Sequence, residues 1–315
     1  MGERPIAAEA RDLVKDFDGK RAVDGVSLTV PEASITGILG PNGAGKTTCL
    51  RMMLGIIDPS SGTRSLLGHD RPIEIAHLIG YLPEERGLYP AMPAVEALAF
   101  IGALRGLPIR ESRRRALVLL RSSGHEDWAK RPIRTLSKGM AQTVQLLGTI
   151  IHEPKLIVLD EPFAGLDAIN QQKLEQLIRD QAAAGVTVIF STHVIAHAER
   201  LCERVVIIAE GKSAFEGAVD EARARLRPIV HVRTRAEDGP WRAALPASAA
   251  NVGGEWRFEL PADGPEPLLK ALIDGGAGIE TLSIERPGLH DAFIAIAGEA
   301  AAREMGHAAP TEEAA

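Results

Sequence analysis

The sequence has few aromatic residues, only two cysteines and no apolar run long enough to cross a membrane. Cys49 and Cys202 provide neither a disulfide framework nor the spacing of metal ligands, so we expect both to be buried free thiols. The most apolar helix candidate, residues 94–107, is interrupted by Glu96 and Arg105, whereas a membrane-spanning helix needs about 18 or more apolar residues. We therefore expect a chain that does not span a membrane by itself.

A targeting signal is also missing from the sequence. Residues 1–6 contain no apolar signal core, and Ile6 stands where a myristoylation signal requires Ser or Thr. The net charge of −6 argues against a nucleic-acid partner. The 315 residues are 45% hydrophobic and 25% charged, which is typical of a soluble protein with one large α/β domain and one smaller domain. We expect this chain in the cytoplasm.

The strongest motif is a glycine-rich loop that begins at Gly40 and satisfies the pattern G-x-x-x-x-G-K-[ST]. The apolar residues 35–39 predict a buried strand before the loop, and residues 47–54 predict a helix after it. Such a loop turns backbone N–H groups toward a phosphate, so we expect Lys46 to contact the β- and γ-phosphates and Thr47 to bind magnesium. The residues expected to bind the nucleotide here are Gly40, Pro41, Asn42, Gly43, Ala44, Gly45, Lys46, Thr47 and Thr48.

Two adjacent carboxylates follow a second apolar run. Residues 156–159 are typical of a fully buried parallel strand, and Asp160 and Glu161 come directly after it, at the end of the strand where α/β sheets hold ligands. Buried carboxylates are costly without a cation nearby, and a magnesium nucleotide supplies one. We expect Asp160 to hold the metal and Glu161 to act on a water as the general base. A similar strand, residues 186–190, ends shortly before His193.

The N-terminal part predicts an antiparallel edge layer. Residues 13–30 form two strand candidates that turn at Gly19, the second with alternating apolar and polar residues. Phe17 lies in this turn, where it either offers a ring face to a base or belongs to the core. Residues 60–68 are rich in turn-forming residues.

A helical segment interrupts the α/β pattern at about residues 84–150. Residues 93–107 and 109–123 predict two helices, the first with one apolar face. Ser137 precedes a further helix and is a candidate N-cap, so the start of that helix is a second candidate anion site. Two anion sites in one chain need an explanation.

Five motifs in this order resemble the ATP-binding cassette (ABC) family over about residues 13–217. Besides the phosphate loop, the family's signature segment resembles residues 136–140, its second carboxylate motif residues 156–161, its following loop residues 165–167, and its switch histidine His193. The resemblance implies an α/β fold of the P-loop NTPase class, with a parallel-sheet core, an antiparallel β layer and a helical subdomain. It also implies an ATPase that uses ATP and Mg²⁺.

The same resemblance implies where the nucleotide lies. The aromatic residue that stacks on adenine in the family matches Phe17, and Asp167 matches a residue of the nucleotide site. In the family two copies associate head to tail, and ATP lies between the phosphate loop of one copy and Ser137 and Gly139 of the other. Such a dimer would explain the two anion sites.

The sequence departs from the family pattern at two places. Lys138 and Met140 stand where the signature usually has Gly and Gln, but the two residues that contact the γ-phosphate are retained. In the switch loop the family usually has Gln, and here the residue is Glu84, which we expect to be a catalytic residue and a magnesium ligand; the alternative is a solvated loop residue that turns away from the site. Glu84 followed by residues 85–89 resembles bacterial exporter ATPases of the sodium-efflux type. That subgroup implies a small C-terminal domain.

A second domain is predicted for residues 218–298 after a cassette of residues 1–217. Strand and helix candidates alternate in it, so we expect a small α+β module. The strand candidates are residues 229–234, 256–260 and 279–285, and the helix candidates are residues 265–273 and 289–297. The alanine- and glutamate-rich residues 299–315 predict a disordered tail.

Two classes of function agree with these motifs. In the first, ATP-driven closure of the dimer moves a separate integral-membrane permease, an exporter, which docks at residues 87–94 and holds the chain at the inner face of the cell membrane. In the second, a soluble cassette ATPase acts on nucleic acid or ribosomes, but proteins of that kind carry two cassettes or long coiled coils. A phosphoryl transferase gives no role to residues 137–139. We therefore predict the energy-coupling subunit of an exporter.

Overall fold

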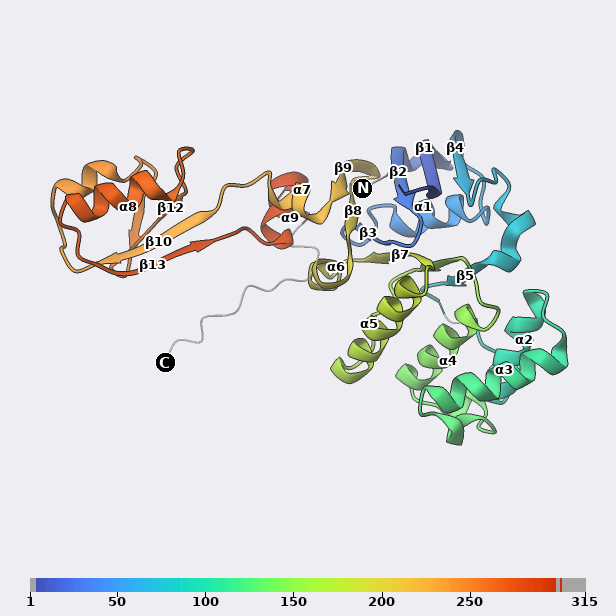
Figure 1. Cartoon of the computed structure of the whole chain (residues 1–315). Helices are drawn as coiled ribbons and strands as arrows, with labels where there is room; N and C mark the ends of the chain where they lie inside the picture. The colour runs from blue at the N-terminus through green and yellow to red at the C-terminus, as the bar shows by residue number, and fades with distance from the viewer. Residues whose placement is uncertain (1–3, 86, 299–300, 302–315) are drawn as a thin grey trace. The chain divides into compact units, whose positions relative to one another are not determined.

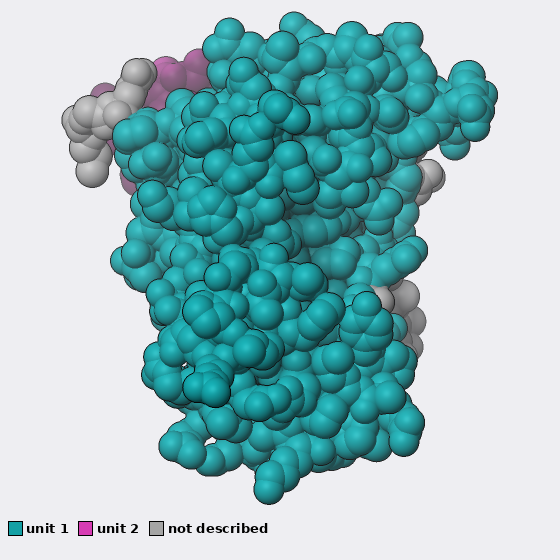
Figure 2. Space-filling view, turned by 90° about the vertical axis from the view of Figure 1, so that its right-hand side faces the viewer, with its two compact units in different colours: residues 1–219, 296–315 teal, residues 220–295 magenta. Residues whose placement is uncertain are grey.

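The chain divides into two compact units, Met1–Val219 with Ile296–Ala315 and Asp220–Ala295, which Figure 2 distinguishes by colour. The structure, a computed structural model, describes residues 4–85, 87–298 and 301. The sequence analysis placed the boundary after residue 217 and assigned residues up to 298 to the second domain, whereas here the chain from residue 296 belongs to the first unit. The predicted tail, residues 299–315, lies outside the described residues except for residue 301.

The first unit is built on a sheet with the strand order β5-β6-β7-β3-β8-β9 (Figure 1). Strands β5 to β8 pair in parallel with their neighbours, and only β9 is antiparallel, to β8. All residues of β3, β6 and β7 are buried, which explains their continuous apolar runs. The predicted parallel-sheet core is confirmed. The strands are β3 (Ile35–Leu39), β5 (Ile79–Leu82), β6 (Leu156–Leu159), β7 (Thr187–Thr192), β8 (Arg204–Ala209) and β9 (Lys212–Ala218).

A second, antiparallel sheet has the order β2-β1-β4 and confirms the predicted antiparallel layer. Its strands are β1 (Ile6–Phe17), β2 (Lys20–Pro31) and β4 (Ser61–Leu66). The turn-forming residues 60–68 gave no sign of a strand, but β4 pairs with β1 along this stretch. Only Leu66 of β4 is buried, so the strand has no apolar pattern and forms through its pairing with β1.

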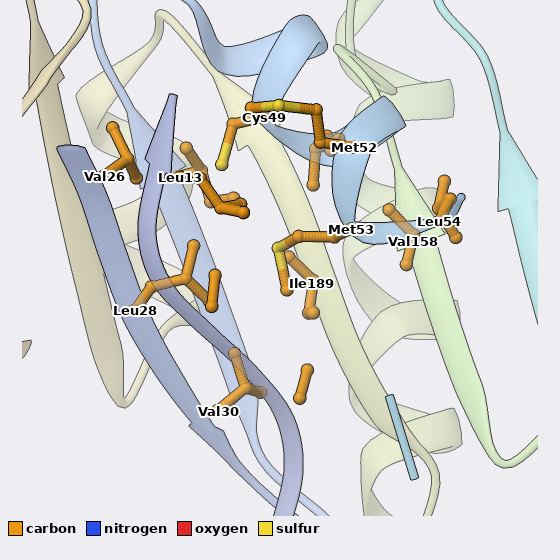
Figure 3. Packing of buried hydrophobic residues seen from close by; sticks show 14 of the residues in the cluster. Leu13, Val26, Leu28, Val30, Cys49, Met52, Met53, Leu54, Val158 and Ile189 are labelled. Carbon is orange, nitrogen blue, oxygen red and sulfur yellow. The ribbon is translucent and has the colours of Figure 1, made fainter. Parts of the chain in front are cut away.

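Helix α1 (Lys46–Met53) lies between the two sheets and packs against both. Figure 3 shows Met53 of this helix close to Ile189 of the parallel sheet, with Leu13 and Leu28 of the antiparallel layer on the other side. All four side chains are buried and belong to one apolar cluster. Because the first residue of α1 is the lysine of the phosphate loop, this packing fixes the loop to the core of the unit.

Helices α2 (Ala94–Leu104), α3 (Ile109–Ser122) and α4 (Lys138–Ile150) lie between β5 and β6 in the chain and share an apolar cluster of their own. The predicted N-cap is confirmed, because the Ser137 hydroxyl accepts a hydrogen bond from the backbone N–H of Met140. Helices α5 (Ala168–Ala183) and α6 (Ile195–Leu201) flank β7 in sequence. Short 3-10 turns occur at Pro72–Leu78, Glu126–Trp128 and Ile133–Thr135.

The second unit contains an antiparallel sheet with the order β11-β12-β10-β13. The predicted α+β character is confirmed. Strand β11 was not predicted, because its three residues are all exposed and all are polar or small except for Val252. Trp241 and Leu272 are fully buried in its core. The elements are α7 (Val219–Arg223), β10 (Ile229–Thr234), a 3-10 turn (Pro240–Ala244), β11 (Ala250–Val252), β12 (Glu255–Glu259), α8 (Pro265–Asp274), β13 (Ile279–Glu285) and α9 (Leu289–Ala297).

Two further expectations concern cysteines and membrane spans. Cys49 and Cys202 are free thiols, and burial raises the pKa of Cys49 to about 12. Among the residues that the structure describes, no helix combines the length and the apolar character that a membrane crossing requires.

Candidate nucleotide site

The glycine-rich loop joins β3 to α1, and its glycines are required by its shape. Gly43 and Gly45 have φ angles of 78° and 102°, in the left-handed region that other residues avoid. A Cβ atom on Gly40 would lie 2.2 Å from the carbonyl oxygen of Ile208, and one on Gly45 would lie 2.6 Å from that of Ala22. The backbone is therefore packed too closely for any side chain at these two positions.

A cavity of about 670 Å³ opens over this loop and is large enough for a nucleotide. It is lined by nine residues that the sequence analysis singled out: Phe17, Asn42, Gly43, Gly45, Lys46, Thr47, Thr48, Glu84 and Glu161. The remaining lining residues are Lys20, Arg21, Ala22, Glu210 and Gly211. Phe17 is 45% exposed, so part of its ring is available for stacking. The Lys15 ammonium lies 5.2 Å from the centre of the same ring.

Lys46 is buried in the loop, and its ammonium group is held by oxygen atoms. Its Nζ donates hydrogen bonds to the carbonyl oxygens of Gly40 (2.7 Å) and Pro41 (3.0 Å). The same Nζ lies 3.2 Å from Oε1 of Glu161, at ion-pair distance. The loop thus places one positive charge beside the carboxylate that was predicted to be the general base.

Asp160 is connected to the loop through Thr47. The Thr47 hydroxyl donates a hydrogen bond to Oδ1 of Asp160 (3.1 Å), and the Ser191 hydroxyl donates a second one to the same oxygen (2.6 Å). Burial raises the pKa of Asp160, while these two hydrogen bonds lower it. Its other oxygen, Oδ2, is buried and has no hydrogen-bond partner among the described residues. A buried carboxylate oxygen next to a threonine hydroxyl is a donor set that fits Mg²⁺.

Glu161 has an unusual backbone conformation. Its φ angle is 48°, which is uncommon for a residue with a side chain and costs roughly 1–3 kcal/mol. The backbone N–H of Glu161 donates to the Ser191 hydroxyl (2.9 Å), and Oε2 of its side chain lies 2.8 Å from Nδ1 of His193. Glu161 is therefore held by contacts with β7 and with the residue that follows this strand.

Three predicted site residues lie outside this cavity, the phosphate loop and the contacts of the two carboxylates. Ser137 is exposed and caps α4, and Gly139 lies in the first turn of that helix. Asp167 caps α5, because its Oδ1 accepts a hydrogen bond from the backbone N–H of Asn170 (2.9 Å), and this bond lowers the pKa of Asp167. One chain therefore does not bring these residues to its own phosphate loop.

Ser191 is the main site residue to which the sequence analysis gave no role. It ends a predicted buried strand beside Asp160 and Glu161, and a polar residue at the carboxyl end of such a strand is the signal that could have identified it. Arg21 and Glu210 were also missed. Arg21 is the second residue of β2, and Glu210 lies in the β8–β9 connection; no pattern in the sequence places these two residues beside the phosphate loop.

The comparison with known proteins is consistent with this site. The model of the ABC transporter family matches residues 23–164. An uncharacterized ABC transporter ATP-binding protein of Bacillus subtilis is 33% identical over 90% of this chain and 95% of that protein. The chain belongs to the family of ABC transporter ATP-binding proteins. As a member of this family it binds nucleotide and is an ATPase.

Other similar proteins extend this result. The Nod factor export ATP-binding protein I of Burkholderia lata is 34% identical over 96% of this chain and 99% of that protein. The daunorubicin/doxorubicin resistance ATP-binding protein of Streptomyces peucetius is 30% identical over 99% of both chains. A solved structure of an ATP-binding subunit of an ABC transporter has a TM-score of 0.64 and 31% identity, covering 70% of this chain and 92% of that chain. The cassette fold is confirmed.

The Ser191→Ala variant tests the network around the carboxylates. It removes a partner from the N–H of Glu161 and from Asp160, both buried, so we expect the protein to be less stable by about 1–3 kcal/mol. We also expect the ATPase rate to fall by roughly tenfold or more, because Glu161 loses its support. Ser27→Ala is the matched control, since the Ser27 hydroxyl bonds the N–H and carboxylate of Asp12 far from the site. A wild-type rate in Ser191→Ala would contradict this role.

Proposed function

We propose that the chain is the energy-coupling subunit of an exporter, in which two copies close head to tail around ATP and drive a separate membrane permease. The observation that carries this proposal is the separation of the two anion sites. Lys46 and Thr47 line the nucleotide cavity, whereas Ser137 caps another helix, is exposed and does not line it. A second copy that offers its Ser137 and Gly139 to the open side of the cavity completes the site.

The roles of the site residues follow from their positions. Adenine stacks on Phe17, and the phosphates lie over the loop with Lys46 as their nearest cation. Thr47 and Asp160 hold Mg²⁺, which when bound offsets the phosphate charge. Glu161 takes a proton from the attacking water, and His193 orients its carboxylate through the 2.8 Å contact.

The contact between Lys46 and Glu161 also has a functional meaning. The positive charge of Lys46 lies 3.2 Å from the carboxylate of Glu161, so the two groups hold one another in place. Phosphates that attract the ammonium group reduce its hold on Glu161. Glu161 is therefore released to act on a water in a chain that has bound its substrate.

The export function rests on similar proteins. Two proteins that align with nearly the whole chain are named for Nod factor export and for resistance to daunorubicin and doxorubicin. For the permease contact, we propose the surface around Tyr89, which is 57% exposed and meets the ring of Phe100 edge to face at 5.6 Å. Exposed aromatic residues are typical anchors of protein interfaces. A chain docked in this way lies at the cytoplasmic face of the membrane.

Substitution of Lys46 and of Glu161 should separate binding from hydrolysis. We expect Glu161→Gln to bind ATP and to accumulate as a closed dimer, with an ATPase rate lower by roughly 10²–10⁴-fold. We expect Lys46→Ala to lose roughly tenfold or more in ATP affinity, because a charge-assisted contact with phosphate is missing. Nucleotide binding, size-exclusion chromatography and ATPase rates distinguish the two. Glu153→Gln, which changes an exposed carboxylate in the connection between α4 and β6, serves as the control, and full turnover by Glu161→Gln would exclude Glu161 as the base.

Mixed dimers test the head-to-tail arrangement. Lys46→Ala damages the phosphate loop and Ser137→Arg damages the surface offered to the partner, so each variant alone should be inactive. A mixed dimer contains one site in which both halves are intact, and we expect it to recover part of the wild-type rate. If mixed dimers form, as cross-linking of tagged subunits would reveal, and remain inactive, the composite site does not exist.

Glu84 is proposed as a ligand on the magnesium side of the site. It is exposed and lines the nucleotide cavity, and its carboxylate binds magnesium more strongly than the amide of Gln. We expect Glu84→Gln to bind ATP normally but to need roughly tenfold more magnesium for half-maximal ATPase activity. Asp18→Asn, which lies outside the lining set, is the control. An unchanged magnesium profile would remove Glu84 from the metal site.

A further inference from the structure

A second cavity, of about 380 Å³, lies in the first unit and shares no lining residue with the nucleotide cavity. Its walls come from the end of α3, from α4, from α5 and from the segment that follows Glu161. The volume is within the range of roughly 300–1,000 Å³ that small-molecule sites occupy. Its apolar lining residues are Leu82, Leu146, Leu147, Pro162, Leu166, Leu174 and Leu177.

Several polar side chains around this cavity are already engaged with the protein. The Gln142 amide donates to the carbonyl oxygen of Pro162 (2.7 Å), and the Thr143 hydroxyl donates to that of Gly139 (3.0 Å). The Gln176 amide likewise donates to the carboxylate of Asp180 (2.7 Å). These groups form the frame of the cavity and leave its apolar walls free for a ligand.

Two basic side chains in the lining lack such partners. His125 is 8% exposed and stacks on Trp128 at 3.7 Å, and its ring nitrogens form no hydrogen bond with any residue that the structure describes. Lys173 forms no ion pair within the same described part of the chain. Both side chains line the same cavity, and burial and the charge of Lys173 both lower the pKa of His125. The two side chains thus leave N–H donors in the lining that no described residue accepts.

We propose that this cavity binds an anionic amphiphile, a molecule with an apolar body and one carboxylate or sulfonate group. The leucine walls take the apolar body, since they are the larger part of the buried lining. The anionic group lies between His125 and Lys173, where it accepts hydrogen bonds that the protein leaves unmade. A neutral ligand of the same shape would fill the walls but leave both basic groups unpaired.

Occupation of the cavity alters ATP hydrolysis. One wall is α4, which Ser137 caps, and another includes Pro162, which directly follows Glu161. The hydrogen bond from Gln142 to Pro162 connects these walls, so a ligand between them changes their spacing. This consequence rests on the proposed roles of Ser137 and Glu161, whereas binding of the ligand does not.

The test uses the full-length protein and 1-anilinonaphthalene-8-sulfonate, an anionic apolar probe that fluoresces in apolar sites. We expect saturable binding of one probe per chain that excess ATP does not displace. N-phenyl-1-naphthylamine lacks the sulfonate, and we expect its affinity to be lower by at least about tenfold. Decanoate, an aliphatic carboxylate, should displace the probe. Displacement by ATP, or equal binding of the neutral compound, would overturn the proposal.

Variants connect the probe to this cavity. Lys173→Gln removes the charge and His125→Phe keeps a ring against Trp128, so both should fold and weaken probe binding by roughly tenfold. Lys155→Gln removes a lysine that does not line the cavity and should bind as the wild type does. Unchanged binding in Lys173→Gln would overturn the site.

At saturating probe we expect the ATPase rate to change by about twofold or more in the wild type, and a constant rate would overturn the effect on hydrolysis.

Discussion

The structure depends on how charged groups are paired at the carboxyl ends of buried strands. Lys46, Asp160 and Glu161 are each less than 10% exposed, and burial of an unpaired charge costs several kcal/mol. The chain meets this constraint by placing the lysine against the loop carbonyls and against one carboxylate, and by supporting the two carboxylates with Ser191. The strand order of the sheet serves this pairing, because β6 and β7 are neighbours and β3 delivers the loop beside them.

Continuous apolar strands and glycine motifs could be predicted from the sequence. A strand that is buried on both faces consists of apolar residues, and this run is visible in the sequence. Strand β3 and the loop after it are examples, as is β6 before Asp160. Strands β4 and β11 could not be predicted, since polar, exposed residues form them through pairing with a neighbour. For the site, the motifs predicted the residue types, but the link through Ser191 depends on contacts between strands that are distant in sequence.

The departure of the signature segment from the family pattern has a structural counterpart. Lys138 lies against Gly165, so closely that a Cβ atom on this glycine would be 3.1 Å from Cε of the lysine. Gly165 has a φ angle of 73° and begins the turn before Asp167. The long side chain at position 138 therefore connects the start of α4 with the segment after the carboxylates. The second cavity lies between the same two parts of the chain, so both features concern how they are spaced.

The carbonyl oxygens of Gly40 and Pro41 hold the side chain of Lys46 in place within the phosphate loop. In many binding sites a positively charged side chain is ordered only when its anion arrives, and this ordering reduces affinity. Here two carbonyl oxygens of the loop itself fix the ammonium group, so its position does not depend on the anion. Preorganisation of this kind reduces the conformational entropy that is lost when a phosphate binds.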